Sequence, residues 1–130
     1  MTTIYDPYEE AELMRDVISK SYDITATSKF LGVSYEELDK RAQNHEVLRF
    51  RDAGGNAWFP RFQFDSAGGV VPYVQSVVRI LLDRGFTELE AAVWLTRGSG
   101  MFGGVSAVEF MRVDPKRFGI VLHLARHGNP

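Results

Sequence analysis

Hydrophobic positions in the first third of the chain recur at the spacing of helices. Between residues 7 and 20 they fall every three or four residues, with charged positions between them, which predicts a helix with one buried face. Residues 24–31 and 34–44 repeat the pattern on either side of Gly32, a residue that accepts the left-handed backbone of a tight turn. Two short helices joined in this way predict a helix-turn-helix.

The hydrophobic period shortens to two residues after these helices. Alternation over residues 47–51 predicts a half-buried strand, and the aromatic segment 57–64 predicts a return strand across the polar loop 52–56. A hairpin directly after a helix-turn-helix is typical of a wing. Its aromatic residues are candidates for stacking on single-stranded bases, but we expect them to pack between two halves of the chain. They are Trp58, Phe59, Phe62 and Phe64.

The second half of the chain is helical in character. Residues 65–69 are the one linker-like stretch, so we place a domain boundary between residues 64 and 65. Beyond it, capping residues and apolar stripes predict four helices, over residues 72–85, 87–98, 106–111 and 114–127. The sequence therefore predicts a mainly α protein, with a winged helix-turn-helix domain over residues 1–64 and a four-helix partner-binding domain over residues 65–130.

Composition restricts the classes of function. With 45% hydrophobic residues among 130, the chain has enough apolar surface to fold. It contains no cysteine, which excludes a disulfide framework and fits a reducing cytoplasm. The sequence shows no secretion leader and no apolar run near the roughly 20 residues that a membrane span needs, so we expect a cytoplasmic protein that is not bound to a membrane.

A net charge of −2 gives no overall attraction to nucleic acid, so DNA binding requires a local patch. Residues 40–61 include five basic residues and two acidic ones, which gives this segment a net positive charge. Basic, amide and phenol side chains on the second helix and the wing suit contacts with bases and phosphates. The candidate DNA-binding residues are Tyr35, Lys40, Arg41, Gln43, Asn44, Arg49, Arg51, Asn56 and Arg61.

Three acidic residues on the same helix, Glu36, Glu37 and Asp39, oppose this interpretation because they repel phosphate. The alternative is a solvated helix face that binds no DNA, with its acids stabilised by the positive end of the helix dipole.

The glycine-rich segment 98–104 is not a phosphate-binding loop, because no strand precedes it and no Lys-Ser or Lys-Thr pair follows. Met101 and Phe102 between its glycines are candidates for a partner contact, or else fold back onto the helices. His123 and His127 lie one helical turn apart without a third ligand, so we expect a surface pair and no metal site. No catalytic set or cofactor fingerprint is visible, and we expect a protein that is not an enzyme and has no cofactor.

Four segments resemble Xre/MbcA/ParS-type antitoxins: residues 59–64, 69–72, 92–95 with their Trp-Leu step, and 103–111 with their Gly-Gly-x-Ser start. The similarity covers roughly residues 57–127. Ala107 and Met111 stand where that family has proline and leucine. The N-terminal half instead looks like a winged, excisionase-like or MerR-like module.

The resemblance implies a type II antitoxin, usually a homodimer, that represses its own promoter by binding operator DNA and neutralises a protein toxin. In that family the toxin is often an NAD-consuming RES-domain protein. Trp94 and Leu95 would brace the toxin-binding domain, and we expect the partner surface among exposed groups nearby. These are Met101, Phe102, Arg112, Arg117, Arg126 and His127.

Two other functions stay open. One is a phage or mobile-element repressor or excision factor, which binds DNA but has no toxin partner. The other is a protein-interaction module that inhibits a host protein and shows no salt-sensitive affinity for DNA.

Overall fold

A computed structural model describes residues 5–128, which contain seven α-helices, one small sheet and three short 3₁₀ helices. The helices of the N-terminal part are α1 (Pro7–Ser19), α2 (Ile24–Leu31) and α3 (Tyr35–Gln43). The antiparallel sheet has the order β1-β3-β2, with strands β1 (Ser21–Asp23), β2 (Phe50–Arg51) and β3 (Ala57–Pro60). The 3₁₀ helix η1 (Arg61–Gln63) follows β3 directly.

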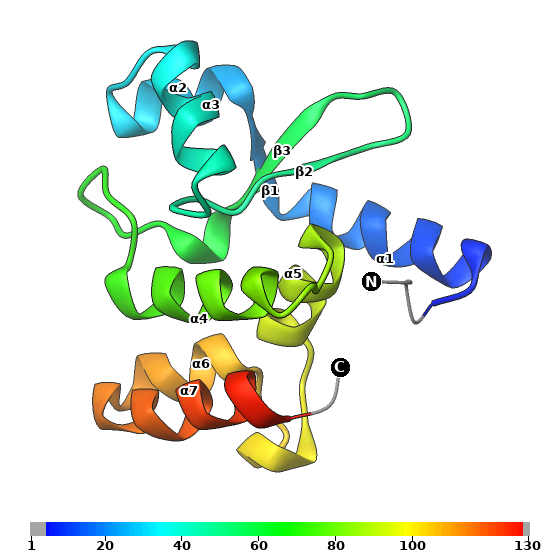
Figure 1. The fold of residues 1–130 in the computed structure, drawn as a ribbon, viewed down its shortest axis with the longest axis vertical. Helices are drawn as coiled ribbons and strands as arrows, with labels where there is room; N and C mark the ends of the chain where they lie inside the picture. The colour runs from blue at the N-terminus through cyan, green and yellow to red at the C-terminus, as the bar shows by residue number, and fades with distance from the viewer. Residues whose placement is uncertain (1–4, 129–130) are drawn as a thin grey trace.

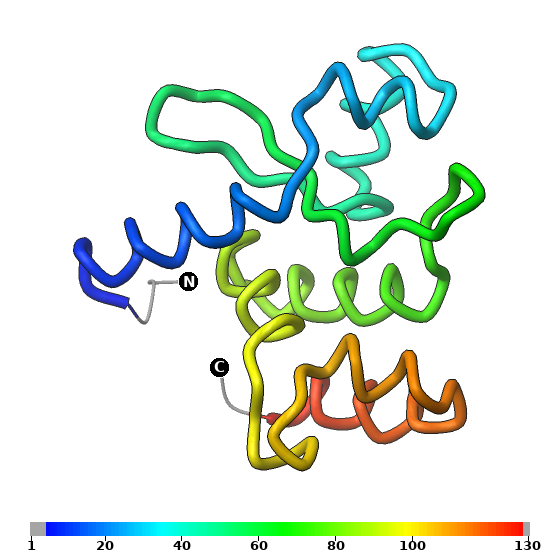
Figure 2. Tube along the Cα trace, turned by 180° about the vertical axis from the view of Figure 1, so that it is seen from behind, coloured from blue at the N-terminus to red at the C-terminus, as the bar shows by residue number. Residues whose placement is uncertain are grey.

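The C-terminal part consists of α4 (Pro72–Asp83), α5 (Glu88–Thr96), α6 (Ala107–Val113) and α7 (Phe118–His127), with η2 (Gly100–Phe102) and η3 (Pro115–Arg117) in the connections. In Figure 1, α4 and α5 lie between the helix-turn-helix with its sheet above and α6 with α7 below. Helix α4 packs on α7, and α5 packs on both α6 and α1. Figure 2 shows from behind how α1 projects to one side. The predicted fold class is confirmed.

Side-chain caps explain why the helices begin where the sequence predicts. Asp6 accepts a hydrogen bond from the backbone N–H of Glu9 (2.7 Å) at the start of α1. At α5, the hydroxyl of Thr87 accepts from the N–H of Glu90 (3.1 Å), and the Glu90 carboxylate accepts from the N–H of Thr87 (2.8 Å). Such reciprocal bonds satisfy two N–H groups that have no partner inside the helix.

The sheet differs from the prediction in two ways. Strand β1 was not predicted, because three residues between two helices are too few to show an alternating pattern. It pairs with β3, with Tyr22 opposite Phe59. The hairpin strands are also shorter than the predicted 47–51 and 57–64, because the chain turns into a 3₁₀ helix after Pro60.

Two hydrophobic clusters stabilise the fold. The smaller one, under the helix-turn-helix, buries Leu38, Val47 and Phe59. The larger one fills the space among the C-terminal helices and also takes in residues from the N-terminal part, which are Val17, Leu48 and Phe50. The division into domains at residues 64 and 65 stays a prediction, and the larger core extends across it.

The aromatic residues of the hairpin divide between these clusters. Trp58 and Phe62 pack against the larger cluster and so connect the two parts of the chain, as expected. Phe59 is fully buried in the smaller cluster. Phe64 also packs there, with its ring centroid 5.4 Å from that of Phe30. None of these rings stands in a row open to solvent, so their packing supports the structural role over base stacking.

Gln63 is a polar residue in this core, with only 1% of its surface exposed. Its amide nitrogen donates to the carbonyl oxygens of Leu48 (2.9 Å) and Pro60 (3.0 Å). Its amide oxygen accepts from the N–H of Leu48 (2.8 Å). One side chain therefore satisfies both backbone groups of Leu48 where the chain enters the hairpin.

Gln63→Leu removes these bonds while keeping a similar volume. We expect the free energy of unfolding to fall by about 2–3 kcal/mol, because the N–H and C=O of Leu48 are left buried without partners. Urea denaturation followed by circular dichroism measures the change. The matched control is Gln43→Leu on the exposed face of α3, which we expect to alter stability by less than about 0.5 kcal/mol. Equal effects of the two substitutions would contradict this role for Gln63.

Candidate nucleic-acid interface

The turn between α2 and α3 has the geometry of a helix-turn-helix. Gly32 ends α2 in the left-handed conformation with a φ of 69°, which side chains with a Cβ rarely adopt. The N–H of Val33 donates to the carbonyl of Ser28 (3.1 Å), and the Ser28 hydroxyl donates back to the carbonyl of Val33. Ser34 then caps α3 by accepting from the N–H of Glu37 (3.1 Å). The turn therefore fixes the direction of α3.

Helix α3 buries Leu38 and Ala42 and turns its other face to solvent. The candidate residues on that face are all exposed: Tyr35, Lys40, Gln43 and Asn44. The Tyr35 hydroxyl lies 2.9 Å from the hydroxyl of Thr25 on α2, so the two helices also meet at the surface. The structure thus brings together a polar helical face of the kind that reads the major groove.

Intramolecular ion pairs hold two of the three acids on α3. The carboxylate of Glu37 lies 3.3 Å from the guanidinium of Arg41, one turn further along the helix. That of Asp39 lies 2.6 Å from the guanidinium of Arg49 and also accepts from the amide of Gln43 (2.8 Å). These pairs lower the repulsion of phosphate that the sequence indicated. They also engage Arg41 and Arg49, two of the candidate DNA-binding residues.

Arg49 and Arg61 do not lie on the strands of the wing, in contrast to the prediction. Arg49 precedes β2, and its side chain is only 18% exposed because it reaches back to α3. Arg61 begins η1 after β3, where its guanidinium lies 5.9 Å from the ring centroid of Tyr22 and 3.5 Å from the carbonyl of Ser19. Of the three arginines assigned to the wing face, only Arg51 is part of a hairpin strand.

Asp52 organises the loop of the wing. Its carboxylate accepts from the indole N–H of Trp58 (3.0 Å) and from the backbone N–H groups of Gly54 and Asn56 (2.9 Å each). The hydrogen bond from Trp58 contributes most to lowering the pKa of Asp52 below its ordinary value, followed by the backbone bond from Asn56. The side-chain amide of Asn56, a candidate DNA contact, also bonds to this carboxylate at 3.2 Å.

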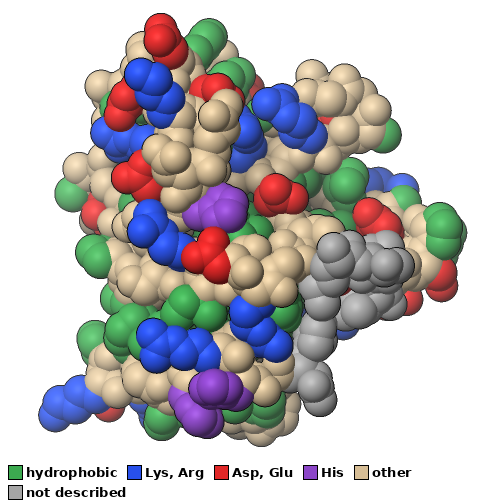
Figure 3. All heavy atoms as spheres, in the orientation of Figure 1, with side chains coloured by type: hydrophobic (Ala, Val, Ile, Leu, Met, Phe, Trp, Pro, Cys, Tyr) green, Lys and Arg blue, Asp and Glu red, His purple; other side chains and the backbone are tan. Residues whose placement is uncertain are grey.

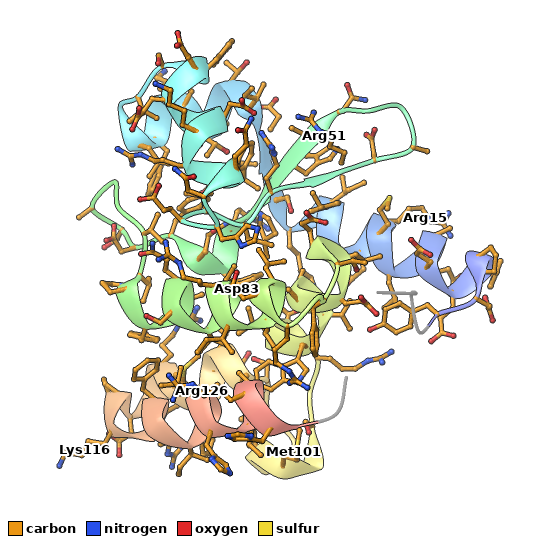
Figure 4. The ribbon with its side chains drawn as sticks, in the orientation of Figure 1. Arg15, Arg51, Asp83, Met101, Lys116 and Arg126 are labelled. Atoms are coloured by element: carbon orange, nitrogen blue, oxygen red, sulfur yellow. The ribbon has the colours of Figure 1, made fainter. Side chains whose placement is uncertain are left out.

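Arg51 lies at the base of the wing, labelled on the hairpin in Figure 4. Its guanidinium donates to the carbonyl of Gly55 (3.2 Å) across the loop. Within residues 5–128, no carboxylate forms an ion pair with Lys40, Arg51 or Arg61, which are all exposed. Figure 3 shows acidic and basic side chains intermixed over the upper part of the molecule, so charge there is local and modest.

The proposed partner residues of the C-terminal part separate into different places. Met101 is 54% exposed, but the expected exposure of Phe102 is wrong. Phe102 is 3% exposed because η2 turns its ring into the core, 5.1 Å from the ring of Phe110. Arg117 is half-buried, with its guanidinium 4.5 Å from the same ring. Figure 4 shows Met101 and Lys116 at opposite sides of the lower half.

Arg112, Arg126 and His127 are exposed as predicted. The rings of His123 and His127 lie 4.8 Å apart on α7. Across residues 5–128 there is no group of three or more His, Cys, Asp or Glu that could hold a metal ion. No helix in the same range is long and apolar enough to cross a membrane.

The hydrogen bond from the Trp58 indole lowers the pKa of the Asp52 carboxyl group. We expect an NMR titration of the side-chain carboxyl carbon to give Asp52 a pKa below its ordinary 3.8. Trp58→Phe removes the largest cause and should move that pKa upward. Because a lowered pKa in the folded state stabilises the fold above the unfolded pKa, this contribution is lost as the pH falls through the folded value. An unchanged pKa in Trp58→Phe would show that the hydrogen bonds from Asn56 and Gly54 account for the shift without the indole.

No protein-family model and no curated protein matches this chain. Among solved structures, the NMR structure of Rv2175c is similar to it, with a TM-score of 0.66 over 95% of this chain and 86% of that chain. The two sequences are 19% identical, so the likeness shows a shared fold alone. It extends from the helix-turn-helix part into the C-terminal helices, and it establishes the architecture of this chain as a mainly helical fold with a small antiparallel sheet.

Proposed function

We propose that this protein is a DNA-binding transcriptional regulator that places α3 in the major groove and its wing on the adjacent backbone. The observation that carries the proposal is the exposed polar face of α3 after a helix-turn-helix, held by the ion pair of Asp39 with Arg49 next to a hairpin on which Arg51 is exposed. The major groove, about 12 Å wide, admits one α-helix.

The side chains divide into two roles in this proposal. Lys40 and Asn44 are exposed near the end of α3 and suit contacts with guanine and adenine edges. Tyr35 and Arg51 suit contacts with phosphate, which set the register on the duplex but carry no sequence information. Arg49 is a positioning residue, because its 2.6 Å bond to Asp39 connects the start of the hairpin to α3.

We propose that the protein binds DNA as a homodimer, because one chain carries few basic side chains that are free to contact phosphates. On α3, the hairpin and η1, the cations without an ion pair among the described residues are Lys40, Arg51 and Arg61, so one chain neutralises only a few phosphates. The salt dependence of DNA binding scales with the number of phosphates neutralised. Two chains on half-sites about one helical turn apart double that number and add specificity.

Replacing Lys40 and Arg51 together by alanine tests the DNA interface. We expect at least about tenfold weaker binding to the DNA upstream of the protein's own gene. The slope of log affinity against log salt concentration should become less steep by about one to two units for each chain. Fluorescence anisotropy at two salt concentrations measures both. The matched control, Arg112→Ala with Lys116→Ala, removes the same charge from the C-terminal part and should leave binding unchanged.

The outcomes of this test are distinct. Equal loss in both variants would show that overall charge, and not this face, attracts DNA. If the wild-type protein binds neither upstream DNA nor a scrambled duplex at low salt, the regulator proposal is wrong. The chain would then be an interaction module in which the helix-turn-helix is a scaffold.

The proposal assigns the C-terminal helices to a protein toxin, as in an antitoxin. Its support is the resemblance of residues 57–127, together with the exposure of Met101, Arg112, Arg126 and His127. Phe102 is withdrawn from this surface because it is buried.

The toxin assignment is tested with the product of the neighbouring gene. We expect co-expression to restore growth that this product alone arrests, and the two proteins to co-purify. Arg126→Glu with Met101→Asp should weaken the complex at least about tenfold by introducing acids at its proposed surface, as measured by calorimetry. Arg79→Glu on α4, away from the proposed toxin-binding surface, is the control and should leave the affinity for the toxin unchanged. No rescue and no complex would contradict the antitoxin proposal while leaving DNA binding intact.

A further inference from the structure

A cavity of about 180 Å³ lies between the segment just before α1, helix α5 and the turn η2. One wall is formed by Glu90, Val93 and Trp94 on one face of α5, and by Arg97, the residue that caps the end of this helix. Tyr5, just before α1, closes the opposite side. Helix α5 packs on α1, and Figure 1 shows it beside the end of α1 that leads into β1.

The inner walls are aromatic and rigid. Phe86 and Phe102 are buried, at 5% and 3% exposure, and the ring of Trp94 stands edge-on to that of Phe102 with centroids 6.1 Å apart. Trp94 itself is half-buried, so part of its indole faces the cavity. Met101 forms an exposed rim, where a flexible thioether adapts to the shape of an occupant.

The polar groups lie at definite places around this aromatic chamber. Glu90 is 2% exposed, and its carboxylate already serves the cap of α5 by accepting from the N–H of Thr87. Arg97 is exposed, and the Ser99 hydroxyl accepts from the N–H of Met101. Among residues 5–128 this hydroxyl donates no hydrogen bond of its own. Tyr5 and Arg97 both line the cavity. Burial is the largest cause that raises the pKa of the Tyr5 hydroxyl; the charge of Arg97 lowers this pKa, and the charges of Glu90 and Glu9 raise it.

We propose that this cavity binds a small aromatic carboxylate of one or two fused rings, with its ring on Trp94 and its carboxylate at Arg97 and Ser99. The volume sets the size, because an apolar cavity of about 150 Å³ accommodates benzene and drug-sized ligands need about 300 Å³ or more. The positions of the charged residues predict an anionic ligand. Arg97 lies at the solvent-accessible mouth of the cavity, and its planar guanidinium suits a carboxylate. Glu90 lies inside, where its carboxylate is already hydrogen-bonded.

Binding of such a ligand can also affect the position of the helix-turn-helix. The ligand touches Tyr5 and α5 together, and α1 leads through β1 into α2 without an intervening loop. A ligand held between α5 and Tyr5, which leads into α1, favours the arrangement in which these two parts lie close together. As a regulator of DNA affinity the site rests on the proposed function, but its binding of the carboxylate does not.

The two tryptophans allow a direct test by NMR of the wild-type protein without DNA. Indole-3-acetate is titrated while the two indole N–H signals are followed, assigned with Trp58→Phe. We expect the signal of Trp94 to shift with a Kd between about 0.1 and 1 mM, as befits a ligand of this size. The signal of Trp58, whose N–H bonds to Asp52, should stay in place. Tryptamine, which carries an amine in place of the carboxylate, should bind at least about tenfold more weakly.

Two variants locate the site. Arg97→Gln should weaken indole-3-acetate about tenfold and remove its advantage over tryptamine, while Arg112→Gln, a matched change elsewhere, should have no effect. Val93→Phe fills the cavity and should abolish the shift, with its fold verified by the remaining spectrum. The inference is overturned if the Trp94 signal does not shift at about 5 mM indole-3-acetate, which is roughly the highest practical concentration. It is also overturned if tryptamine binds as tightly as indole-3-acetate, or if Arg97→Gln and Arg112→Gln have the same effect on binding.

Discussion

The burial of Leu48 and Phe50 in the C-terminal core is the packing on which the rest of this structure depends. Both residues lie where the chain enters the hairpin, and both belong to the cluster formed by the C-terminal helices. Removing each from water contributes about 1.5–3 kcal/mol. Since a buried backbone also needs partners, the three hydrogen bonds of Gln63 make this burial possible at Leu48 and Pro60. The wing is therefore anchored in the other half of the chain.

This anchoring determines how helix α3 is held. Arg49, next to Leu48, bonds to Asp39 in the middle of α3. The end of α3 contacts α4 at two more points, where Arg79 donates to the carbonyl of Asn44 (3.4 Å) and His45 lies 3.1 Å from Asp83. Helix α3, the hairpin and α4 are thus connected to one another. A ligand or protein that shifts the C-terminal helices would also act on the proposed DNA-binding face, which links the two halves of the proposed function.

The same connections change the character of the candidate interface. A count of charges along residues 40–61 suggests a basic patch, but Arg41 and Arg49 are engaged by acids of α3. The exposed cations that remain are few, so groove shape and polar contacts from α3 carry more of the proposed recognition than charge does. Near the other end of the molecule, Phe102 packs inward and leaves a small aromatic cavity where the sequence indicated a protruding contact.

Local signals in the sequence determined the helices, the helix-turn-helix and the position of the hairpin, because caps such as Thr87 with Glu90, the turn at Gly32 and the hydrophobic period act between near neighbours in the chain. Strand β1, the pairing of Arg49 with Asp39, the burial of Phe102 and the cavity beside Tyr5 were decided only by tertiary structure. Each depends on residues distant in the chain, or on the direction in which one side chain turns. Neither periodicity nor composition contains that information, because both describe only which residues are near one another along the chain.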